Sequence, residues 1–489
     1  MNATTISIKK AALINAISKY SNVVFMLIAN AILARILSPS DYGIVAMITV
    51  FVSFFNMLSD MGLGTGVIQN KELDMDDINN IFSCTIYMGV ILAILFIILS
   101  YPISVFYSNK VYIPIGYLLS ISVLFTTLNM IPNSILMKEK KFALVAIRTI
   151  VVYMGSNIIT IILALNGWKY YSLVAQSIIS SIATFMWNYK SSKLKFKLRF
   201  EIDSVRKIIG YSSFNFAYDL LNYFGRNLDN ILTGRFMGAV ALGYYNKAYQ
   251  LMLYPVQYLT NVITPVLHPI LSDYSEKKAY IYIKYINIFK VLSLMGVFIT
   301  IYCVFATNEI VFILYGEKWI SIVPCVKMLS ISIWFQMTTS TCTSIFRSLG
   351  HAQLRFKSGR AYIVIQIFMI IVGAVSNDIY VLACLVSVSF IIRFFVEYYF
   401  LINKAFEIPI IKFYKLLIPE IIISFISVTF MIMISRIEFN NVLISAAYKF
   451  IMLSLIFIIG VKITKQWKYI FNILPNKIKR NERIIKKIV

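Results

Sequence analysis

The sequence predicts an all-α integral membrane protein with about fourteen transmembrane helices. Hydrophobic residues make up 59% of the chain, charged residues make up 14%, and the mean hydropathy is +0.78. Soluble globular domains carry about 25% charged residues, so this composition excludes that class. Apolar runs of about 20 residues, the length that crosses a bilayer as a helix, recur along the whole chain.

The apolar runs give the order and approximate limits of the expected helices. They lie at 12–33, 42–66, 78–106, 112–136, 143–165, 170–188, 209–233, 241–267, 285–306, 320–346, 360–376, 381–402, 416–435 and 442–462. Lys9 and Lys10 before the first run are also typical of a signal peptide. That run has the full length of a span, and no small-residue cleavage site follows it, which favours a retained first helix.

The net charge of +25 would suit a nucleic-acid-binding protein, but the positions of the charges indicate another cause. With a cytoplasmic N-terminus, the termini and the even-numbered loops contain 32 of the 46 Lys and Arg residues, and the odd-numbered loops contain six. This asymmetry is the positive-inside signature and predicts that both termini are cytoplasmic. The basic sequence NKIKRNERIIKK is interpreted as a topology signal and an anchor to anionic membrane lipid, not as a nucleic-acid arm.

Motifs for catalysis or metal binding are absent from the sequence. It contains no phosphate-binding loop, no cluster of metal ligands and no nucleophile motif. The five cysteines fall in apolar stretches without paired spacing, and His268 and His351 are the two histidines. We therefore expect no disulfide, no metal, no cofactor and no enzymatic activity.

The chain repeats itself after 200 residues, which is typical of transporters. Further along, Tyr107–Lys110 corresponds to Tyr315–Lys318. Because six helices return the chain to the same side of the membrane, the repeat predicts two six-helix lobes with parallel orientation. The polar residues that recur without a gap are Asn15, Asn22, Asn30, Arg35 and Gly43, which match Asn215, Asn222, Asn230, Arg235 and Gly243.

The repeat also sets the expected domains. They are an N-terminal lobe at 1–190, a basic cytoplasmic linker at 191–207, a C-terminal lobe at 208–403, and two extra helices with a basic tail at 404–489. The linker sequence KLKFKLRF alternates cations with apolar residues. This pattern suits either an amphipathic segment on the cytoplasmic leaflet or a solvated connection.

One face of the predicted seventh helix is polar along its length. A charge near the bilayer centre costs about 3 kcal/mol or more when lipid surrounds it, so this face is expected to point at protein or water. An ion-pair network between helices and the wall of a hydrated path both explain it. The face contains Tyr211, Asn215, Tyr218, Asp219, Asn222, Arg226, Asp229, Asn230 and Thr233, and the matching face of the first helix contains Asn15, Ser18, Lys19, Asn22 and Asn30.

Several further polar residues lie within apolar runs. The tyrosine-rich eighth helix carries Lys247, and Asp60 precedes the glycines of MGLGTG at the end of the second helix. Tyrosine suits sugar stacking and helix packing equally well. Arg393 and Glu397, four residues apart, are expected to pair with each other. Side chains near span ends are expected to snorkel, namely Arg148, Lys290 and Lys327.

Three blocks carry a family resemblance. They are ARILSPSDYGIVAMITVF at 34–51, DMGLGTGVIQ at 60–69 and RNLDNILTGRFMGAVALGYYNKAYQLMLYPV at 226–256. They resemble the polysaccharide transporter family, and within it the Wzx-like lipopolysaccharide O-antigen and capsule flippases, of the multidrug/oligosaccharidyl-lipid/polysaccharide exporter superfamily. The resemblance covers essentially the whole chain. It implies a MATE-like fold and a flippase that carries polyprenyl-diphosphate-linked oligosaccharide across the bacterial inner membrane by alternating access.

The resemblance also implies a cationic central cavity walled by helices 1, 2, 7 and 8. Arg226 is the first candidate for the diphosphate and Lys19 the second, because a guanidinium binds phosphate with two hydrogen bonds. The membrane potential alone would drive export of the anion, or H⁺ or Na⁺ would be coupled to it. The cavity candidates are Lys19, Asn22, Asn215, Asn222, Arg226 and Lys247, the coupling or ion-pair candidates are Asp60, Asp219 and Asp229, and the periplasmic repeat positions are Arg35 and Arg235.

Two other functions remain open. A cation-coupled small-molecule or drug exporter of the same superfamily would have an acidic cavity without excess cations. A membrane polysaccharide polymerase or ligase would need a long periplasmic loop with catalytic Arg or His residues. The candidate cavity is mixed to basic and the odd-numbered loops are short, so both rank below the flippase, for which polymerase and chain-length proteins are expected partners.

Overall fold

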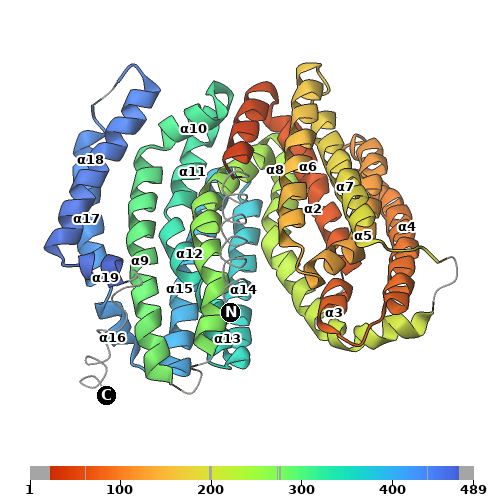
Figure 1. Ribbon diagram of the computed structural model, residues 1–489. Coiled ribbons are helices and arrows are strands. Elements are labelled where there is room, and N and C mark those ends of the chain that lie inside the picture. Colours follow the sequence, from red (N-terminus) through yellow and green to blue (C-terminus); the bar gives the residue numbers. More distant parts are fainter. Residues whose placement is uncertain are drawn as a thin grey trace. The chain divides into compact units, whose positions relative to one another are not determined.

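The computed structural model describes residues 23–60, 62–197, 201–272, 274, 277–437 and 439–472, and every regular element among them is helical (Figure 1). The side chains of 202, 206, 208–222, 224, 261–270, 352 and 470–472 lie outside this description. The predicted all-α fold class is confirmed. The described chain divides into two compact units, Met1–Gly243 with Leu314–Lys318, and Tyr244–Ile313 with Trp319–Val489. The predicted lobe limits remain predictions of the sequence repeat.

The helices follow the expected order along the chain. The first described one is Val23–Ile36. It is followed by α2 (Pro39–Asp60), α3 (Leu63–Gln69), α4 (Met75–Phe106), α5 (Tyr112–Lys138), α6 (Phe142–Leu165), α7 (Tyr170–Ser192), α8 (Ile202–Ser272), α9 (Lys278–Phe305), α10 (Thr307–Tyr315), η1 (Glu317–Ile322), α11 (Val323–Ser330), α12 (Ile333–Thr339), α13 (Cys342–Ser348), α14 (Ala352–Val375), α15 (Ile379–Tyr398), η2 (Tyr399–Ala405), α16 (Ile410–Lys415), α17 (Ile418–Ile434), α18 (Val442–Ile463) and α19 (Trp467–Asn472).

Eight helices of the described residues are long and apolar enough to cross a membrane, or nine if one bent pair forms a single span. Val23–Ile36 and Ile418–Ile434 are shorter apolar helices. The chain is therefore a multi-pass membrane protein, and the number of fourteen spans remains a prediction.

Two predicted helices, 209–233 and 241–267, follow each other within α8 and are separated by a kink at Gly238. The loop expected between them is reduced to Gly238, which has φ 82° and ψ −179°. Glycine adopts this positive φ without a steric penalty, so one residue redirects the chain where a loop was expected.

The predicted span 320–346 is broken, with its two halves bent by 47°. At the bend the Ser332 hydroxyl donates to the backbone carbonyl of Leu329 at 2.7 Å. A bond of this kind competes with the helical ladder and bends helices. The apolar composition of this segment therefore predicts its place in the membrane but not its shape.

The start of the basic linker is fastened to α4. Its backbone is extended, and the N–H groups of Lys195 and Lys197 donate to Asn79 Oδ1 (2.8 Å) and Ser83 Oγ (2.9 Å). Beyond it, Lys207 Nζ binds Asp77 Oδ2 at 2.8 Å, and this hydrogen bond raises the pKa of Lys207. Both ends of the linker that the structure describes are thus held by the first turns of α4.

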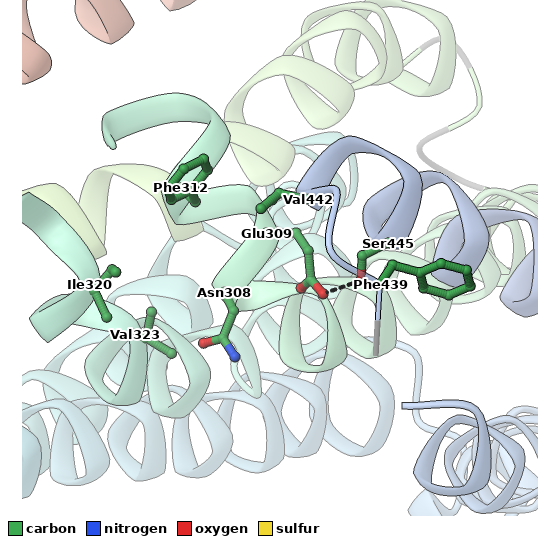
Figure 2. Close-up of a pocket in the computed structure, with 8 residues that line it drawn as sticks. All are labelled: Asn308, Glu309, Phe312, Ile320, Val323, Phe439, Val442 and Ser445. Carbon is green, nitrogen blue, oxygen red and sulfur yellow. Dashed lines mark hydrogen bonds between the residues drawn. The ribbon is translucent and has the colours of Figure 1, made fainter. Parts of the chain in front are cut away.

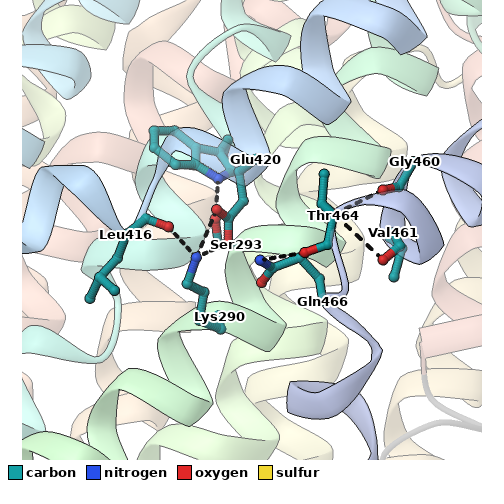
Figure 3. Close-up of polar contacts among 9 residues, drawn as sticks. Lys290, Ser293, Leu416, Glu420, Gly460, Val461, Thr464 and Gln466 are labelled. Carbon is teal, nitrogen blue, oxygen red and sulfur yellow. Dashed lines mark hydrogen bonds and ion pairs between the residues drawn. The ribbon is translucent and has the colours of Figure 1, made fainter.

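Two buried ion pairs connect the extra helices α17 and α18 to α9 and α10. Lys290 Nζ on α9 lies 2.8 Å from Glu420 Oε1 on α17, and their side chains are 1% and 2% exposed (Figure 3). Glu309 on α10 binds Lys449 on α18, with Ser445 Oγ donating to Glu309 Oε1 at 2.7 Å. In the first pair the cation, Lys290, lies on α9, whereas in the second pair the cation, Lys449, lies on the extra helix α18. A displaced or inverted helix pair would leave unpaired charges in a water-poor interior, so the pairs define its register.

Lys290 was expected to snorkel to the membrane surface, and this expectation is wrong. Its ammonium also donates to the Leu416 carbonyl, so protein groups replace the water that snorkelling would have reached. The predicted pair of Arg393 and Glu397 is confirmed, with Arg393 Nε 2.7 Å from Glu397 Oε1.

Replacing Lys290 with Met should destabilise the protein by about 3–5 kcal/mol, because Glu420 remains buried without its cation. The double variant Lys290→Met, Glu420→Met should recover most of this loss. Thermal unfolding of the purified protein in detergent measures both effects. Lys278 and Glu407 form a matched control, since this pair is 2.8 Å long but exposed, and Lys278→Met should leave the midpoint unchanged. Equal destabilisation by the single and double variants would contradict the prediction.

Candidate functional site

The turn between the first described helix and α2 is held by Asp41. Asp41 Oδ2 accepts from the backbone N–H of Ser38 (2.9 Å) and from its hydroxyl (2.6 Å), and Asp41 Oδ1 accepts from the N–H of Tyr170 (3.2 Å). We call residues 35–43 the first elbow. Its counterpart in the sequence repeat, residues 235–243, is the second elbow and contains the break at Gly238.

The two elbows pack against each other backbone to backbone. A Cβ atom on Gly43 would lie 1.7 Å from the carbonyl oxygen of Ala239, and a Cβ on Gly243 would lie 2.0 Å from that of Pro39. The sequence repeat relates these positions, because Pro39 corresponds to Ala239 and Gly43 corresponds to Gly243. Each copy therefore makes the same contact with the other, as a twofold relation requires. We call this contact the glycine seam.

The repeated arginines Arg35 and Arg235 lie beside the seam and are exposed. Lys318 Nζ donates to the Arg35 carbonyl at 2.9 Å, and the Arg235 guanidinium lies 5.6 Å from the centre of the Phe106 ring. Lys318 belongs to the turn Tyr315–Lys318 of the second copy, and Phe106 directly precedes the corresponding turn Tyr107–Lys110 of the first copy. Each elbow is thus contacted beside the seam by a residue at or next to this turn of the other copy.

A polar pocket lies at the opposite end of α2. Its volume is about 300 Å³. Eight of its lining residues are polar, and of the described lining residues Asp60 carries the only charge. The lining consists of Asn56, Ser59, Asp60, Gly64, Thr65, Ile68, Thr126, Asn129, Met130, Asn133 and Ser134. At 1.5 Å per residue, about 25 Å of helix separates Asp60 from the glycine seam.

Two side chains that lie behind the pocket lining orient two of its amides. Asn188 Nδ2 on α7 donates to Asn129 Oδ1 at 2.8 Å, and Arg148 Nη1 on α6 donates to Asn133 Oδ1 at 3.1 Å. Ser59 Oγ and Thr127 Oγ1, 2.7 Å apart, connect α2 to α5. Arg148 was expected to snorkel, but it is 8% exposed and serves this network instead, which corrects the expectation.

The predicted site residues are only partly brought together. Asp60 lines the polar pocket, Arg226 is exposed on α8, and Asp229 is 4% exposed. Lys247 is 2% exposed and belongs to the other compact unit. Lys19 and Asn22 lie outside the described residues, as do the side chains of Asn215, Asp219 and Asn222.

Sequence reasoning missed most of the pocket. Asn129 and Asn133 are four residues apart within an otherwise apolar run, which places both on one helix face. That spacing was the available signal. Their partners Arg148 and Asn188 lie on α6 and α7, so no regular spacing along the sequence relates them to Asn129 and Asn133.

A second cavity of about 340 Å³ lies beside α10 and α18 (Figure 2). Apart from Asn308, Glu309 and Ser445 its lining is apolar. None of its described lining residues is a cation, and the nearby Lys449 is bound to Glu309. The described lining therefore has no cation to hold an anionic group. The lining is Asn308, Glu309, Phe312, Ile320, Val323, Phe439, Val442 and Ser445.

Residues 32–324 match the family described as "Polysaccharide biosynthesis protein". The chain belongs to this family. Three similar relatives are "Uncharacterized membrane protein in cps region" of Klebsiella pneumoniae (24% identical, covering 86% of this chain and 90% of the relative), "Teichuronic acid biosynthesis protein TuaB" of Bacillus subtilis (25%, 73% and 74%) and "Lipopolysaccharide biosynthesis protein WzxC" of Escherichia coli (23%, 68% and 68%).

Two solved structures share the fold of this family member. "Lipid II flippase MurJ, inward closed conformation" matches with a TM-score of 0.73 and 16% identity, covering 94% of this chain and 99% of the other. A "multidrug resistance MATE family transporter of the MOP superfamily", in an inward-facing conformation, matches with a TM-score of 0.58 and 11% identity, covering 77% and 93%. The predicted MATE-like fold is confirmed.

Adding a methyl group at Gly43 or Gly243 should open the glycine seam, because a backbone carbonyl cannot move aside as a side-chain end would. In a variant whose five native cysteines are replaced, Ala239→Cys reports opening through its rate of reaction with a maleimide. Gly43→Ala should raise this rate about tenfold, which corresponds to about 1.4 kcal/mol. Gly155→Ala is the matched control, since no atom lies within 4 Å of its added Cβ. An unchanged rate in Gly43→Ala would show that the seam does not depend on this contact.

Proposed function

We propose that this protein is a flippase that moves polyprenyl-diphosphate-linked oligosaccharide, an O-antigen, capsule or exopolysaccharide repeat unit, from the cytoplasmic to the outer leaflet of the bacterial inner membrane. The chain belongs to a polysaccharide biosynthesis family, and the observation that carries the proposal is the difference between the two ends of α2. Its first turns are closed against the second copy by the glycine seam, and its last turn lines a polar pocket. Alternating access requires one side of the protein to be closed while the other admits substrate, and the seam and the pocket suit these two roles.

The positive-inside pattern gives the proposed orientation. It places both elbows outside and residues 68–77, which follow the pocket, in the cytoplasm. Both termini are then cytoplasmic. In this orientation the seam closes the outer side while the pocket lies near the side where the substrate is made, so the conformation suits loading from the cytoplasm.

The diphosphate is assigned to Arg226, with Lys19 as the second cation. Arg226 is exposed on α8, so its planar guanidinium is available for two hydrogen bonds to phosphate. Lys247, being almost fully buried, would contact substrate only after a rearrangement. Moving two negative charges outward across an inside-negative membrane releases about 2.3 kcal/mol per charge per 100 mV. Asp219 and Asp229 are the proposed carboxylates if H⁺ or Na⁺ is coupled.

The other functions are less well supported. The named relatives belong to teichuronic acid and lipopolysaccharide biosynthesis, which does not favour a small-molecule or drug exporter. The solved structures that share the fold are named as a flippase and a transporter, which argues against a polymerase or ligase. A polymerase and its chain-length partner would instead consume the glycan that this protein delivers.

Arg226→Gln should slow transport while leaving the amount of folded protein unchanged. Losing charge-assisted hydrogen bonds of about 1.5–3 kcal/mol each should reduce the rate at least about tenfold. Translocation is measured in vesicles, and folded protein by size-exclusion chromatography. Arg436→Gln, at an exposed arginine between α17 and α18, is the matched control. Parent-level transport by Arg226→Gln would remove Arg226 from the site, and a parallel loss of folded protein would assign it a structural role.

Mass spectrometry of the lipids that copurify with the protein from its native host tests the function itself. We expect a polyprenyl-diphosphate-linked glycan. Recovery of no such lipid in several detergents would contradict the flippase proposal.

A further inference from the structure

We propose that the polar pocket at the end of α2 is a sugar subsite, which binds the hydroxyl groups of one ring of the transported glycan while the diphosphate is held elsewhere. This inference rests on the proposed function and assigns it a second binding locus. Three observations carry it: the lack of a cation among the described lining residues, the volume of the pocket and the orientation of two amides.

The charge of the lining separates a sugar from a phosphate. Among the described lining residues Asp60 is the single charged group, and none is a cation. A diphosphate placed there would lose water without gaining a cationic partner in the lining. A neutral polyol meets no such penalty. The volume of about 300 Å³ lies at the lower end of the range for small-molecule sites, which suits one ring rather than a whole oligosaccharide.

Two amides on α5 are set to donate hydrogen bonds into the pocket. Asn133 Oδ1 faces Arg148, and a guanidinium can only donate, so this oxygen is assigned without ambiguity. Asn188 Nδ2 donates to Asn133 Oδ1 as well (3.4 Å) and to Asn129 Oδ1 (2.8 Å). The side-chain oxygens of Asn129 and Asn133 accept from Asn188 and Arg148, which lie behind the pocket. The amide nitrogens of Asn129 and Asn133 therefore remain to donate hydrogen bonds to a ligand in the pocket.

The facing helices α2 and α3 supply acceptors. The Asp60 carboxylate belongs to the lining and accepts hydrogen bonds, and the Thr65 hydroxyl on the following helix α3 is a further acceptor. Hydroxyl groups both donate and accept, so neighbouring hydroxyls of a sugar ring match donors on α5 and acceptors on α2 and α3.

The amides on α5 do not favour a cation. A bound Na⁺ would need carbonyl or carboxylate oxygens around it. The oxygens of Asn129 and Asn133 are engaged by Asn188 and Arg148, so Asp60 would be the one carboxylate among the described lining residues to hold the cation, opposite amide N–H groups that repel it. We therefore assign Asp60 to the substrate.

The test compares two probes on the purified full-length protein in detergent. Farnesyl diphosphate carries the anionic group alone, and farnesyl-diphosphate-linked N-acetylglucosamine adds one sugar ring. The parent protein should bind the sugar-bearing probe about tenfold more tightly, and isothermal titration calorimetry measures the ratio. Asn129→Asp keeps an oxygen for Asn188 but removes the donor, and Asn129→Leu removes the amide without adding charge. Both should abolish the tenfold preference and leave the affinity for farnesyl diphosphate within about twofold.

Asn166→Asp is the matched control, because it adds the same charge at an exposed amide outside the pocket. It should keep the preference for the sugar-bearing probe. Thermal unfolding shows that each variant is folded. Should Asn129→Leu fail to fold, Asn129→Asp and Asn133→Asp decide the question.

The outcomes separate the two proposals. Equal affinity of the parent protein for both probes, or equal weakening of both probes by the Asn129 variants, would overturn the sugar subsite and leave the flippase standing. Failure of the parent protein to bind either probe would count against the flippase proposal and would remove the subsite with it.

Discussion

Lipid offers no hydrogen bonds, so a charged group within the membrane is costly unless protein or water satisfies it. The buried pairs Lys290–Glu420 and Glu309–Lys449 follow from this constraint. Each charge is tolerated because its partner is supplied by a helix more than a hundred residues away. The same constraint acts on Arg148, whose guanidinium is directed inward onto Asn133.

The glycine seam shows how the sequence repeat is used. Two copies of one element meet through Gly43 and Gly243, and each glycine admits a backbone carbonyl of the other copy. A contact between backbones at glycine involves no side-chain hydrogen bonds, so it can form and separate without leaving side-chain partners unsatisfied. A seam of this kind suits the closed end of a path that must open during transport.

Charge and hydrogen bonding are divided between different places. Exposed cations such as Arg226 suit an anionic headgroup, while the pocket bounded by α2, α3 and α5 has amides, hydroxyls and one carboxylate. A lipid-linked glycan contains both kinds of group, so separate loci avoid forcing one site to bind a polyanion and a neutral polyol. The extra helices α17 and α18 lie outside this division and are fixed by their ion pairs.

The sequence by itself determined the membrane class, the helix order, the repeat and the pair Arg393–Glu397, because composition and spacing along one helix suffice for these. It also identified Arg35, Arg235, Gly43 and Gly243 as equivalent positions, without showing that the glycines meet. Only the tertiary structure decided that Gly238 replaces a loop, that Lys290 is buried, and that Asn129 and Asn133 are turned by Asn188 and Arg148. The physical reason is that these partners lie on different helices, and the packing of helices, not the spacing of residues, brings them together.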